Sequence, residues 1–396
     1  MATLLLCIIY LAFISLGLPD SLLGSAWPVM HRDFAVPLYF AGMVSAAVTG
    51  GTVISSLLSS RVIRRFGTGR VTALSVALTA IGLLGFSLMP SFYWFVVFAL
   101  PLGLGAGAID TGLNNFVALN YKARHMNWLH CFWGIGAGLS PVIMSWFISE
   151  GEQWRHGYRT VSFVLMGIAL VLSATLFLWK PFEAKHQATT EGPGAPGQKN
   201  IFRIPGVKAA LLGFFSYVSM EGIIGVWGPT YLVMRRGINP NTAAQWLSLY
   251  FLSLTIGRFL SGFVSAFLNN IKLIYLGCLF IALGVIFLAL PLPPVFLLLA
   301  FLLIGFGYAP VFPSMLHETP RRFGPAVSQA IMGWQFALSY IGASCTPMLT
   351  GLIISRISMG LYPFLFVIYL AVLAGSTAFI GVLEKQGKLA NKLDPQ

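Results

Sequence analysis

The sequence contains few charged residues, and acidic residues are especially scarce. Only 9% of its 396 residues are charged, and Asp and Glu together number 11. Soluble domains carry about a quarter charged residues, so this composition excludes an ordinary soluble protein. Hydrophobic residues make up 57% of the chain and fall in long runs. The chain is therefore an integral membrane protein.

Cysteine and basic clusters are also sparse, which excludes further kinds of site. The four cysteines are widely spaced within apolar runs and lack the paired spacing of a metal site. The net charge is +13, yet no basic patch is interleaved with exposed aromatic residues, so we expect no nucleic-acid partner. We also expect no cofactor and no resident metal.

The apolar runs are long enough to cross a bilayer. About 20 apolar residues span the hydrocarbon region as a helix, and only helices or closed barrels satisfy their backbone there. The runs lack the alternation of barrel strands, so the sequence predicts an all-α polytopic protein with twelve transmembrane helices. The expected spans are 4–30, 38–60, 71–89, 93–118, 126–149, 159–180, 207–234, 243–268, 272–290, 294–316, 326–354 and 361–383.

Basic residues predict the orientation of these spans. Alternate sets of loops hold 17 and 6 Lys and Arg residues. Because basic residues in short loops accumulate on the cytoplasmic side, both termini are predicted to be cytoplasmic. We expect a multi-pass monomer in the cytoplasmic (inner) membrane, surrounded by the lipid bilayer.

A polar interruption divides the chain into two halves of similar size. Residues 181–206 include the segment EGPGAPG at 191–197, whose composition is typical of a flexible linker. The predicted domains are an N-terminal six-helix bundle at 1–180, a cytoplasmic linker at 181–206, a C-terminal six-helix bundle at 207–383 and a cytoplasmic tail at 384–396.

The two halves repeat each other. An acid, a glycine and a proline recur 201 residues apart in the stretches 20–28 and 221–229, which begin with Asp20 and Glu221. Gly103 and Gly105 recur as Gly305 and Gly307, and the glycine and proline of 136–149 recur 206 residues later. Parallel repeats of six helices are typical of transporters that work by alternating access.

Four stretches resemble the fucose permease-like sugar transporters of the major facilitator superfamily. They are GLGAGAIDTGLNNFV at 103–117, NWLHCFWGIGAGLSP at 127–141, RFGTGR at 65–70 and GRFLSG at 257–262. The similarity spans nearly the whole chain. It implies the major facilitator fold and proton-coupled symport of a monosaccharide.

The resemblance also implies roles for particular residues. In that family, acids on the first and fourth helices bind solute and transfer protons, and Asp20 and Asp110 stand at these positions. The family pattern has glutamate at the second position, so Asp110 reaches one methylene less far. Arg65, Gly67 and Arg70 match the loop that gates the cytoplasmic side, although its usual acid is absent and Arg64 stands there.

The residues themselves point to Asp110 as a proton carrier. It lies well inside its span among glycines, and burial favours the neutral form of a carboxylate. Asn114, one turn later on the same face, is a candidate solute-binding residue. The alternative is that the pair forms only a structural hydrogen-bonded cluster.

Asp20 and Glu221 are candidate solute-binding acids with alternatives of their own. Asp20 follows Pro19, which can break the helix where solute binds, or Asp20 lies at the outer mouth and is satisfied by water. Glu221 binds solute near Trp227, or it pairs with a polar neighbour such as Tyr217. Acidic oxygens also suit sodium, which remains an alternative to the proton.

Helices five and eleven supply further candidates for the solute site. Asn127 and His130 share one face with a glycine and a proline, and Trp133 lies nearby. Asn127 could instead cap its helix, and Trp133 could simply pack. Gln335 suits recognition of hydroxyl groups because its amide both donates and accepts.

The remaining charges near the membrane have simpler interpretations. Arg258 requires a partner or must extend toward the cytoplasm, and we interpret it as a conformational latch. His317, Glu318, Arg321 and Arg322 are expected to be loop charges at the cytoplasmic end of the tenth span.

These observations favour a secondary active transporter that moves a small polar solute, a monosaccharide by resemblance, with protons. One alternative is a proton antiporter of the same fold that exports drugs or metabolites. A polytopic membrane enzyme is disfavoured, because the intramembrane acids are scattered over three spans and the longest loop lacks catalytic features.

Overall fold

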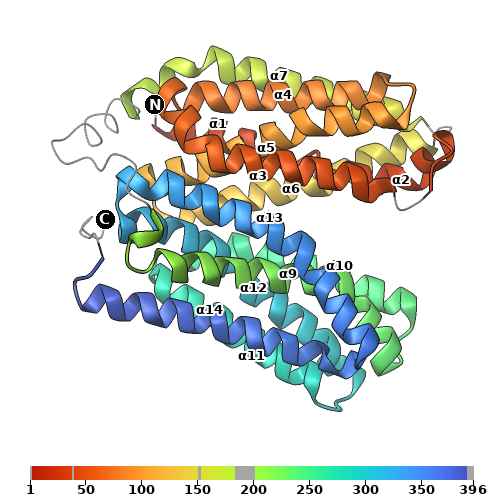
Figure 1. The fold of residues 1–396 in the computed structure, drawn as a ribbon, viewed down its shortest axis with the longest axis vertical. Helices are drawn as coiled ribbons and strands as arrows, with labels where there is room; N and C mark the ends of the chain where they lie inside the picture. The colour runs from red at the N-terminus through yellow and green to blue at the C-terminus, as the bar shows by residue number, and fades with distance from the viewer. Residues whose placement is uncertain (1, 38–39, 150–152, 183–200, 390–396) are drawn as a thin grey trace. The chain divides into compact units, whose positions relative to one another are not determined.

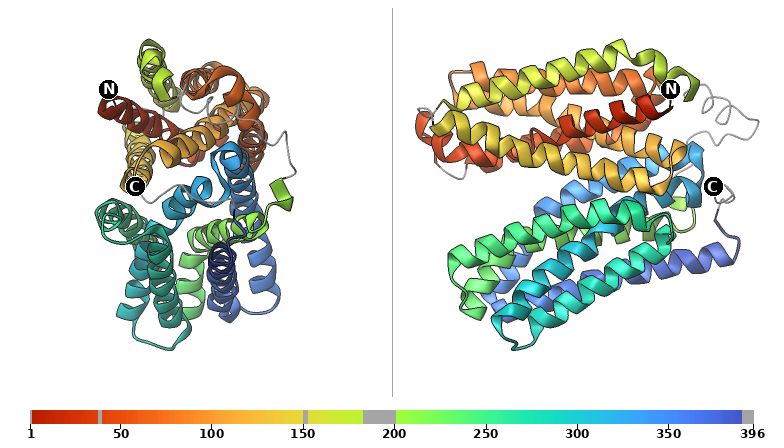
Figure 2. Two further views of the ribbon diagram at one scale, coloured as in Figure 1. Left: turned by 90° about the vertical axis from the view of Figure 1, so that its left-hand side faces the viewer. Right: turned by 180° about the vertical axis from the view of Figure 1, so that it is seen from behind.

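The computed structural model describes residues 2–37, 40–149, 153–182 and 201–389, and within these ranges the chain is helical without strands. Figures 1 and 2 show the helices in chain order from red to blue. In the first half they are α1 (Ala2–Gly17), α2 (Leu22–Asp33), α3 (Ala41–Phe66), α4 (Thr68–Leu88), α5 (Phe92–Asn120), α6 (Ala123–Ser149), α7 (Trp154–Ala174) and the short η2 (Leu176–Leu178). In the second half they are η3 (Ile201–Arg203), α9 (Val207–Arg236), α10 (Pro240–Val264), α11 (Asn270–Ala289), α12 (Pro294–Phe323), α13 (Pro325–Arg356), η4 (Met359–Leu361) and α14 (Tyr362–Lys385).

The described residues contain twelve helical segments long and apolar enough to cross a membrane, as predicted. The first combines α1 with the start of α2 and runs over Thr3–Trp27. Three predicted spans differ clearly in their ends. The second is Gly42–Phe66 rather than 38–60, the sixth is Trp154–Ala174 rather than 159–180, and the tenth continues to Phe323 rather than ending at residue 316. Most of the predicted linker and tail lies outside the described residues.

The chain divides into two compact units, and each unit includes one short segment from the other half of the sequence. Unit 1 takes in residues 1–116, 129–195 and 332–337, and unit 2 takes in 117–128, 196–331 and 338–396. The beginning of α6 therefore belongs to unit 2 and the rest of that helix to unit 1. Likewise, a short stretch of α13 groups with unit 1.

Close helix contacts show that the two halves are structural repeats. In unit 1, Gly103 of α5 lies against the backbone oxygen of Val48 on α3. In unit 2, Gly305 of α12 lies against the backbone oxygen of Tyr250 on α10, where an added Cβ would be 2.6 Å from that oxygen. Both members of the first contact are 202 residues before their counterparts. The predicted duplication is therefore present in the packing of helices.

A second pair of contacts repeats in the same way. Gly136 of α6 lies against the backbone of Ile14 on α1, and Gly342 of α13 lies against the ring of Phe215 on α9. Small residues let membrane helices approach closely, where dispersion and backbone contacts take over the role of hydrophobic burial. The glycines noticed in the sequence thus fix corresponding helix crossings in each unit.

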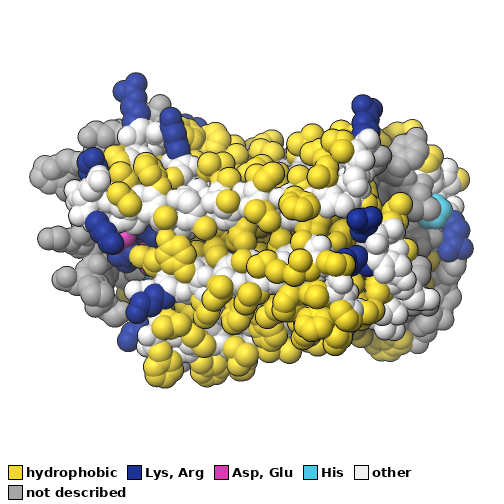
Figure 3. Space-filling model, turned by 90° about the horizontal axis from the view of Figure 1, so that it is seen from below, with side chains coloured by type: hydrophobic (Ala, Val, Ile, Leu, Met, Phe, Trp, Pro, Cys, Tyr) yellow, Lys and Arg dark blue, Asp and Glu magenta, His cyan; other side chains and the backbone are white. Residues whose placement is uncertain are grey.

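The surface fits a lipid environment. Large apolar side chains are widely exposed, including Leu74 at 66% and Phe267 at 87%. On the face shown in Figure 3, hydrophobic side chains gather across the middle while Lys and Arg lie toward the two ends. Apolar surface of this extent is found on proteins that face lipid or a partner.

Candidate functional site

A buried chain of an acid, an amide and an imidazole lies in unit 1. Asn114 Nδ2 donates to Asp110 Oδ1 at 2.9 Å and to the Asp110 backbone oxygen at 2.8 Å. His130 Nε2 lies 3.0 Å from Asn114 Oδ1. An amide oxygen can only accept, so Nε2 of His130 carries the hydrogen and donates. All three side chains are buried, and Asn114 is completely so.

The local sequence explains how these three side chains meet. Asp110 and Asn114 are one turn apart on α5, so both face α6, which carries His130. Phe13 of α1 packs edge-on against the imidazole, with ring centroids 5.5 Å apart. The ring therefore has a fixed orientation toward the amide. The predicted Asp110–Asn114 cluster is present, and His130 belongs to it.

Asp20 occupies a break between two helices. α1 ends at Gly17 and α2 begins at Leu22, so the predicted break around Pro19 is confirmed. Trp133 Nε1 on α6 donates to Asp20 Oδ2 at 2.8 Å. The acid is exposed, as the outer-mouth alternative expected, yet it is also held by an indole. Asp20 is thus bonded to α6, the helix that also carries His130.

Unit 2 holds its acid differently. Glu221 on α9 pairs with Arg258 on α10, with Oε1 and the guanidinium nitrogen 3.8 Å apart. The side chain of Arg258 is only 7% exposed, whereas that of Glu221 is 26% exposed. Tyr217, one turn before Glu221, interacts electrostatically with both charged groups, and its hydroxyl donates to the backbone oxygen of Tyr308 at 3.2 Å. Of the two alternatives given for Arg258, the structure has the partner within the helices, and that partner is Glu221.

Three further residues predicted to bind solute are Asn127, Trp227 and Gln335. Trp227 Nε1 donates to the backbone oxygen of Pro347 at 2.7 Å, so its indole edge is engaged with α13. Gln335 is buried on the short part of α13 that belongs to unit 1. Asn127 Nδ2 donates to the Ala123 oxygen at 3.1 Å. Since Ala123 begins α6, Asn127 lies one turn inside the helix and is not its N-cap.

The predicted gating loop is a single-residue turn. Gly67 ends α3 and starts α4 with φ of 81°, a left-handed value that glycine adopts without strain. Arg65 and Arg70 are both exposed on either side of it. The guanidinium carbon of Arg65 lies 5.4 Å from the ring centroid of Phe66.

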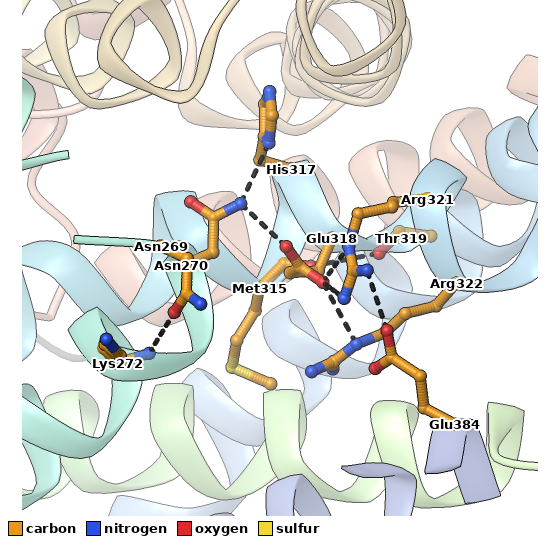
Figure 4. A network of polar contacts seen from close by, with 10 residues as sticks. All are labelled: Asn269, Asn270, Lys272, Met315, His317, Glu318, Thr319, Arg321, Arg322 and Glu384. Carbon is orange, nitrogen blue, oxygen red and sulfur yellow. Dashed lines mark hydrogen bonds and ion pairs between the residues drawn. The ribbon is translucent and has the colours of Figure 1, made fainter. Parts of the chain in front are cut away.

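A third polar cluster lies at the end of α12, where the sequence predicted a loop. Residues 317–322 were expected to be loop charges, but they continue α12, and the side chain of Glu318 is only 5% exposed. Glu318 accepts a hydrogen bond from Asn270 at 2.9 Å and forms ion pairs with Arg321 at 2.5 Å and Arg322 at 3.3 Å (Figure 4). Arg321 also pairs with Glu384 at 2.7 Å. These partners offset the cost of burying the charges, so the helix extends past the apolar run.

The cluster extends to the connection between α5 and α6. Asn270 Nδ2 donates to His317 Nδ1 at 3.0 Å, and His317 Nε2 donates to the backbone oxygen of Tyr121 at 3.0 Å. Burial raises the pKa of Tyr121 to about 12, so its phenol stays protonated. The sequence signal for this cluster was Glu318 placed three and four residues before two arginines, a helical ion-pair spacing.

Comparison with known proteins agrees with this architecture. The model of the Major Facilitator Superfamily matches residues 9–347. The glucose/mannose transporter of Bacillus subtilis is 24% identical over 353 residues, covering 82% of this chain and 86% of the relative. The cis,cis-muconate transport protein of Acinetobacter baylyi is 22% identical over 381 residues, covering 89% and 87%.

Solved structures of similar fold include two sugar symporters. The proton:xylose symporter XylE aligns with a TM-score of 0.77 at 14% identity, covering 98% of this chain and 96% of the other. The E. coli fucose:proton symporter FucP aligns with a TM-score of 0.74 at 16% identity, covering 95% and 98%. At these identities the likeness shows the fold. The matched proteins are transporters, so this protein is a transporter and not an enzyme. Because the family model matches residues 9–347, the chain belongs to the Major Facilitator Superfamily.

Proposed function

We propose that this transporter takes up a monosaccharide together with a proton by alternating access. The observation that carries the proposal is the buried chain of Asp110, Asn114 and His130. A carboxylic acid in the interior of a membrane protein is costly to keep charged, and such residues mark proton or substrate pathways. An amide and an imidazole next to it supply donors and acceptors that match sugar hydroxyl groups.

In the proposed cycle Asp110 takes up a proton from the outside and releases it inside. The proton binds one carboxylate oxygen, and Asn114 continues to donate to Oδ1 in either state. Neutralising the acid changes it from an acceptor alone to a donor and acceptor, which alters how solute hydroxyls bind. Solute and proton drive the cycle only if each binds more tightly to the occluded state than to the open ones.

The comparisons support this choice of solute class. One relative is described as a transporter of glucose and mannose, and two proteins of similar fold are proton symporters of xylose and fucose. The muconate transport protein argues for keeping organic acids in any screen. The predicted roles of Asn127, Trp133, Trp227 and Gln335 in solute binding, and of Arg65, Gly67 and Arg70 in gating, belong to the same proposal.

The experiment is a solute screen in a lightly buffered suspension of cells that produce the protein. D-Glucose, D-mannose, D-xylose, L-fucose and cis,cis-muconate are added in turn, and the pH of the medium is recorded. Proton symport predicts a transient alkalinisation with at least one monosaccharide. A response to muconate alone would contradict the solute class, and uptake that depends on sodium without any pH change would contradict the proton.

A matched pair of variants assigns the proton within this screen. Asp110→Asn is expected to abolish the alkalinisation while the protein remains in the membrane. Asp33→Asn removes a carboxylate of the same kind that is 35% exposed and bonded to Trp154 and Arg155, and it should leave the response intact. Loss of the response in both variants would indicate a general defect and contradict a specific role of Asp110.

We further propose that both termini are cytoplasmic in the cytoplasmic membrane and that the monomer is the working unit. The imbalance of 17 to 6 basic residues between the two sets of loops supports this orientation. Fusing a reporter enzyme that is active only outside the cytoplasm to the C-terminus should give no activity. An active fusion would reverse the orientation.

A further inference from the structure

We infer that Arg258 is a positioning residue that keeps Glu221 ionised throughout transport, so that Glu221 binds solute hydroxyl groups as a carboxylate and carries no proton. This inference rests on the proposed function and assigns the second half of the protein a binding role distinct from proton coupling.

The geometry places a buried cation behind a partly accessible anion. Arg258 is 7% exposed, and Glu221, at 3.8 Å from it, is 26% exposed. The carboxylate therefore has one side against the guanidinium and another open to a ligand. Carboxylate oxygens accept several hydrogen bonds each, so pairing with Arg258 leaves acceptor positions for hydroxyl groups. Arg258 is the buried member of the pair and cannot reach a solute.

Protonation of Glu221 would leave an uncompensated charge in the membrane. A guanidinium stays protonated under all physiological conditions, and removal of one partner of a buried pair leaves the other at high cost. The neutral form of Glu221 is therefore linked to an isolated buried Arg258. This coupling opposes the effect of burial, which by itself favours a neutral acid.

In the described parts of the chain, the further ionisable groups that interact with Glu221 are tyrosines. Tyr217 comes from the same helix, Tyr250 from α10 and Tyr308 from α12, and all three interact electrostatically with Glu221. From α14, Tyr362 interacts with Tyr250 and Tyr308 in turn. These phenols are completely buried and neutral, so they do not compete with Arg258 as charge partners.

On α13 the groups nearest this stretch of α9 are apolar or uncharged. Ala343 and Pro347 pack against Gly222, the residue next to Glu221, and Thr346 is hydrogen-bonded to Ser219 at 3.0 Å. Among the described residues around Glu221, Arg258 is therefore the cation that sets its charge state.

The repeat shows that this arrangement is specific to unit 2. The glycine contacts of the two halves are related by a spacing of 202 residues. By the same spacing, Ser56 is the repeat equivalent of Arg258, and Phe312 is the repeat equivalent of Asp110. Ser56 is buried and its hydroxyl lies 3.4 Å from the Gly107 oxygen, whereas Phe312 packs on Tyr217 with ring centroids 5.6 Å apart. Unit 1 thus has an acid without an arginine at the equivalent place, and unit 2 has the arginine without that acid.

The test is infrared difference spectroscopy on the purified full chain in lipid nanodiscs, without any solute. The pH is stepped from about 8 to about 5, a range in which buried carboxylates titrate, and the carbonyl band of newly protonated carboxylic acids is recorded. Wild type, E221Q, R258M, R258K and the double variant R258M/E221Q are compared. Circular dichroism and gel filtration establish that each variant is folded.

The inference predicts that E221Q leaves the wild-type carbonyl bands unchanged. R258M should add one band that is absent from R258M/E221Q, and R258K should add none because it retains the charge. A wild-type band that disappears in E221Q would overturn the inference, as would a folded R258M without a new band. If R258M does not fold, the E221Q spectrum alone decides between the two outcomes.

A further variant separates this inference from the proposed function. D110N should remove a wild-type band if Asp110 takes up the transported proton. A D110N spectrum identical to wild type would contradict the proton assignment and leave the result for Glu221 and Arg258 standing. The converse result, in which only E221Q removes a band, would contradict this inference and move the proton to unit 2.

Discussion

Asp110 in unit 1 and Glu221 in unit 2 are both acids inside the membrane, but their partners differ in charge. Asp110 accepts a hydrogen bond from the amide of Asn114, and Glu221 lies 3.8 Å from the guanidinium of Arg258. An amide can bond to a carboxyl group in either protonation state, whereas a guanidinium favours the anion. In the roles that we propose, the duplicated halves divide proton coupling and solute binding because the neighbour of the acid differs between them.

The acids that align in the sequence differ as much in local structure. Asp20 lies in the break between α1 and α2, while Glu221 lies inside α9, which is continuous over Val207–Arg236. The difference follows from Pro19, which has no counterpart at Met220. Equivalent positions in the repeat therefore present their carboxylates from different backbones, one exposed and one on a rigid helix.

The largest effect on stability is expected from Arg258→Met at about pH 8, the start of the titration range, where Glu221 is charged without its partner within the helices. Loss of one partner of a buried pair costs about 3–5 kcal/mol. The double variant R258M/E221Q removes both charges and should recover most of this loss. Thermal unfolding in detergent measures the difference, and equal destabilisation in both variants would show that the pair is not the cause.

The hydrogen-bonded chain of Asp110, Asn114 and His130 is tested by Asn114→Ala, which removes the residue that links the acid to the imidazole. Loss of its hydrogen bond to the Asp110 carboxyl group, worth about 1.5 kcal/mol, predicts an approximately tenfold fall in the initial rate of concentrative uptake. Asn127→Ala changes a second proposed solute-binding residue, whose Nδ2 donates to Ala123 of its own helix, and it should cause a smaller fall. A greater loss with Asn127→Ala would move the solute site away from the unit 1 chain.

The symmetry of the halves is tested by Gly105→Ala and Gly307→Ala. An added Cβ would lie 2.6 Å from the Ser75 oxygen in the first case and 2.7 Å from the Gly277 oxygen in the second. Backbone atoms cannot rotate away, so each change should destabilise the protein by about 1–3 kcal/mol.

Controls for this pair exist in both units. Gly167 on α7 and Gly375 on α14 have nothing within 4 Å of an added Cβ, so alanine there should be neutral or slightly stabilising. Unfolding midpoints of the four variants are compared under one condition. Similar shifts for the two tested glycines support equivalent packing, and a shift for only one would show that the repeat has diverged at this crossing.

The smallest effect is expected at the edge of the Glu318 cluster. Glu384 and Arg321 are 33% and 37% exposed, so Glu384→Gln should cost less than about 1 kcal/mol. Glu318→Gln should cost several times more, because Glu318 is buried among Asn270, Arg321 and Arg322. Comparable unfolding midpoints for the two variants would contradict this ranking.

The fold was predictable because its signals are local. Continuous apolar runs indicate the spans, and glycines such as Gly103 and Gly305 recur because each lets one helix approach another. The Asp110–Asn114 contact was also predictable, since two residues on one turn of a helix must be neighbours.

The charged clusters were harder to predict because they depend on several helices at once. Glu221 and Arg258 are 37 residues apart, and only the rotations of α9 and α10 bring them together. The prediction that the tenth span ends at residue 316 was wrong for a related reason. A hydropathy pattern ends where charges begin, but partners from other helices let Glu318 and Arg322 continue the helix while buried.

The most direct test of the account is the number of protons that enter with each solute molecule, measured for D110N and E221Q with the monosaccharide that responds in wild type. D110N should lose proton movement while keeping exchange of solute across the membrane. E221Q should keep the wild-type proton ratio with an apparent affinity lowered about tenfold, as expected for a lost hydrogen bond to a charged group. Proton coupling that survives in D110N, or that disappears in E221Q while exchange continues, would contradict the account.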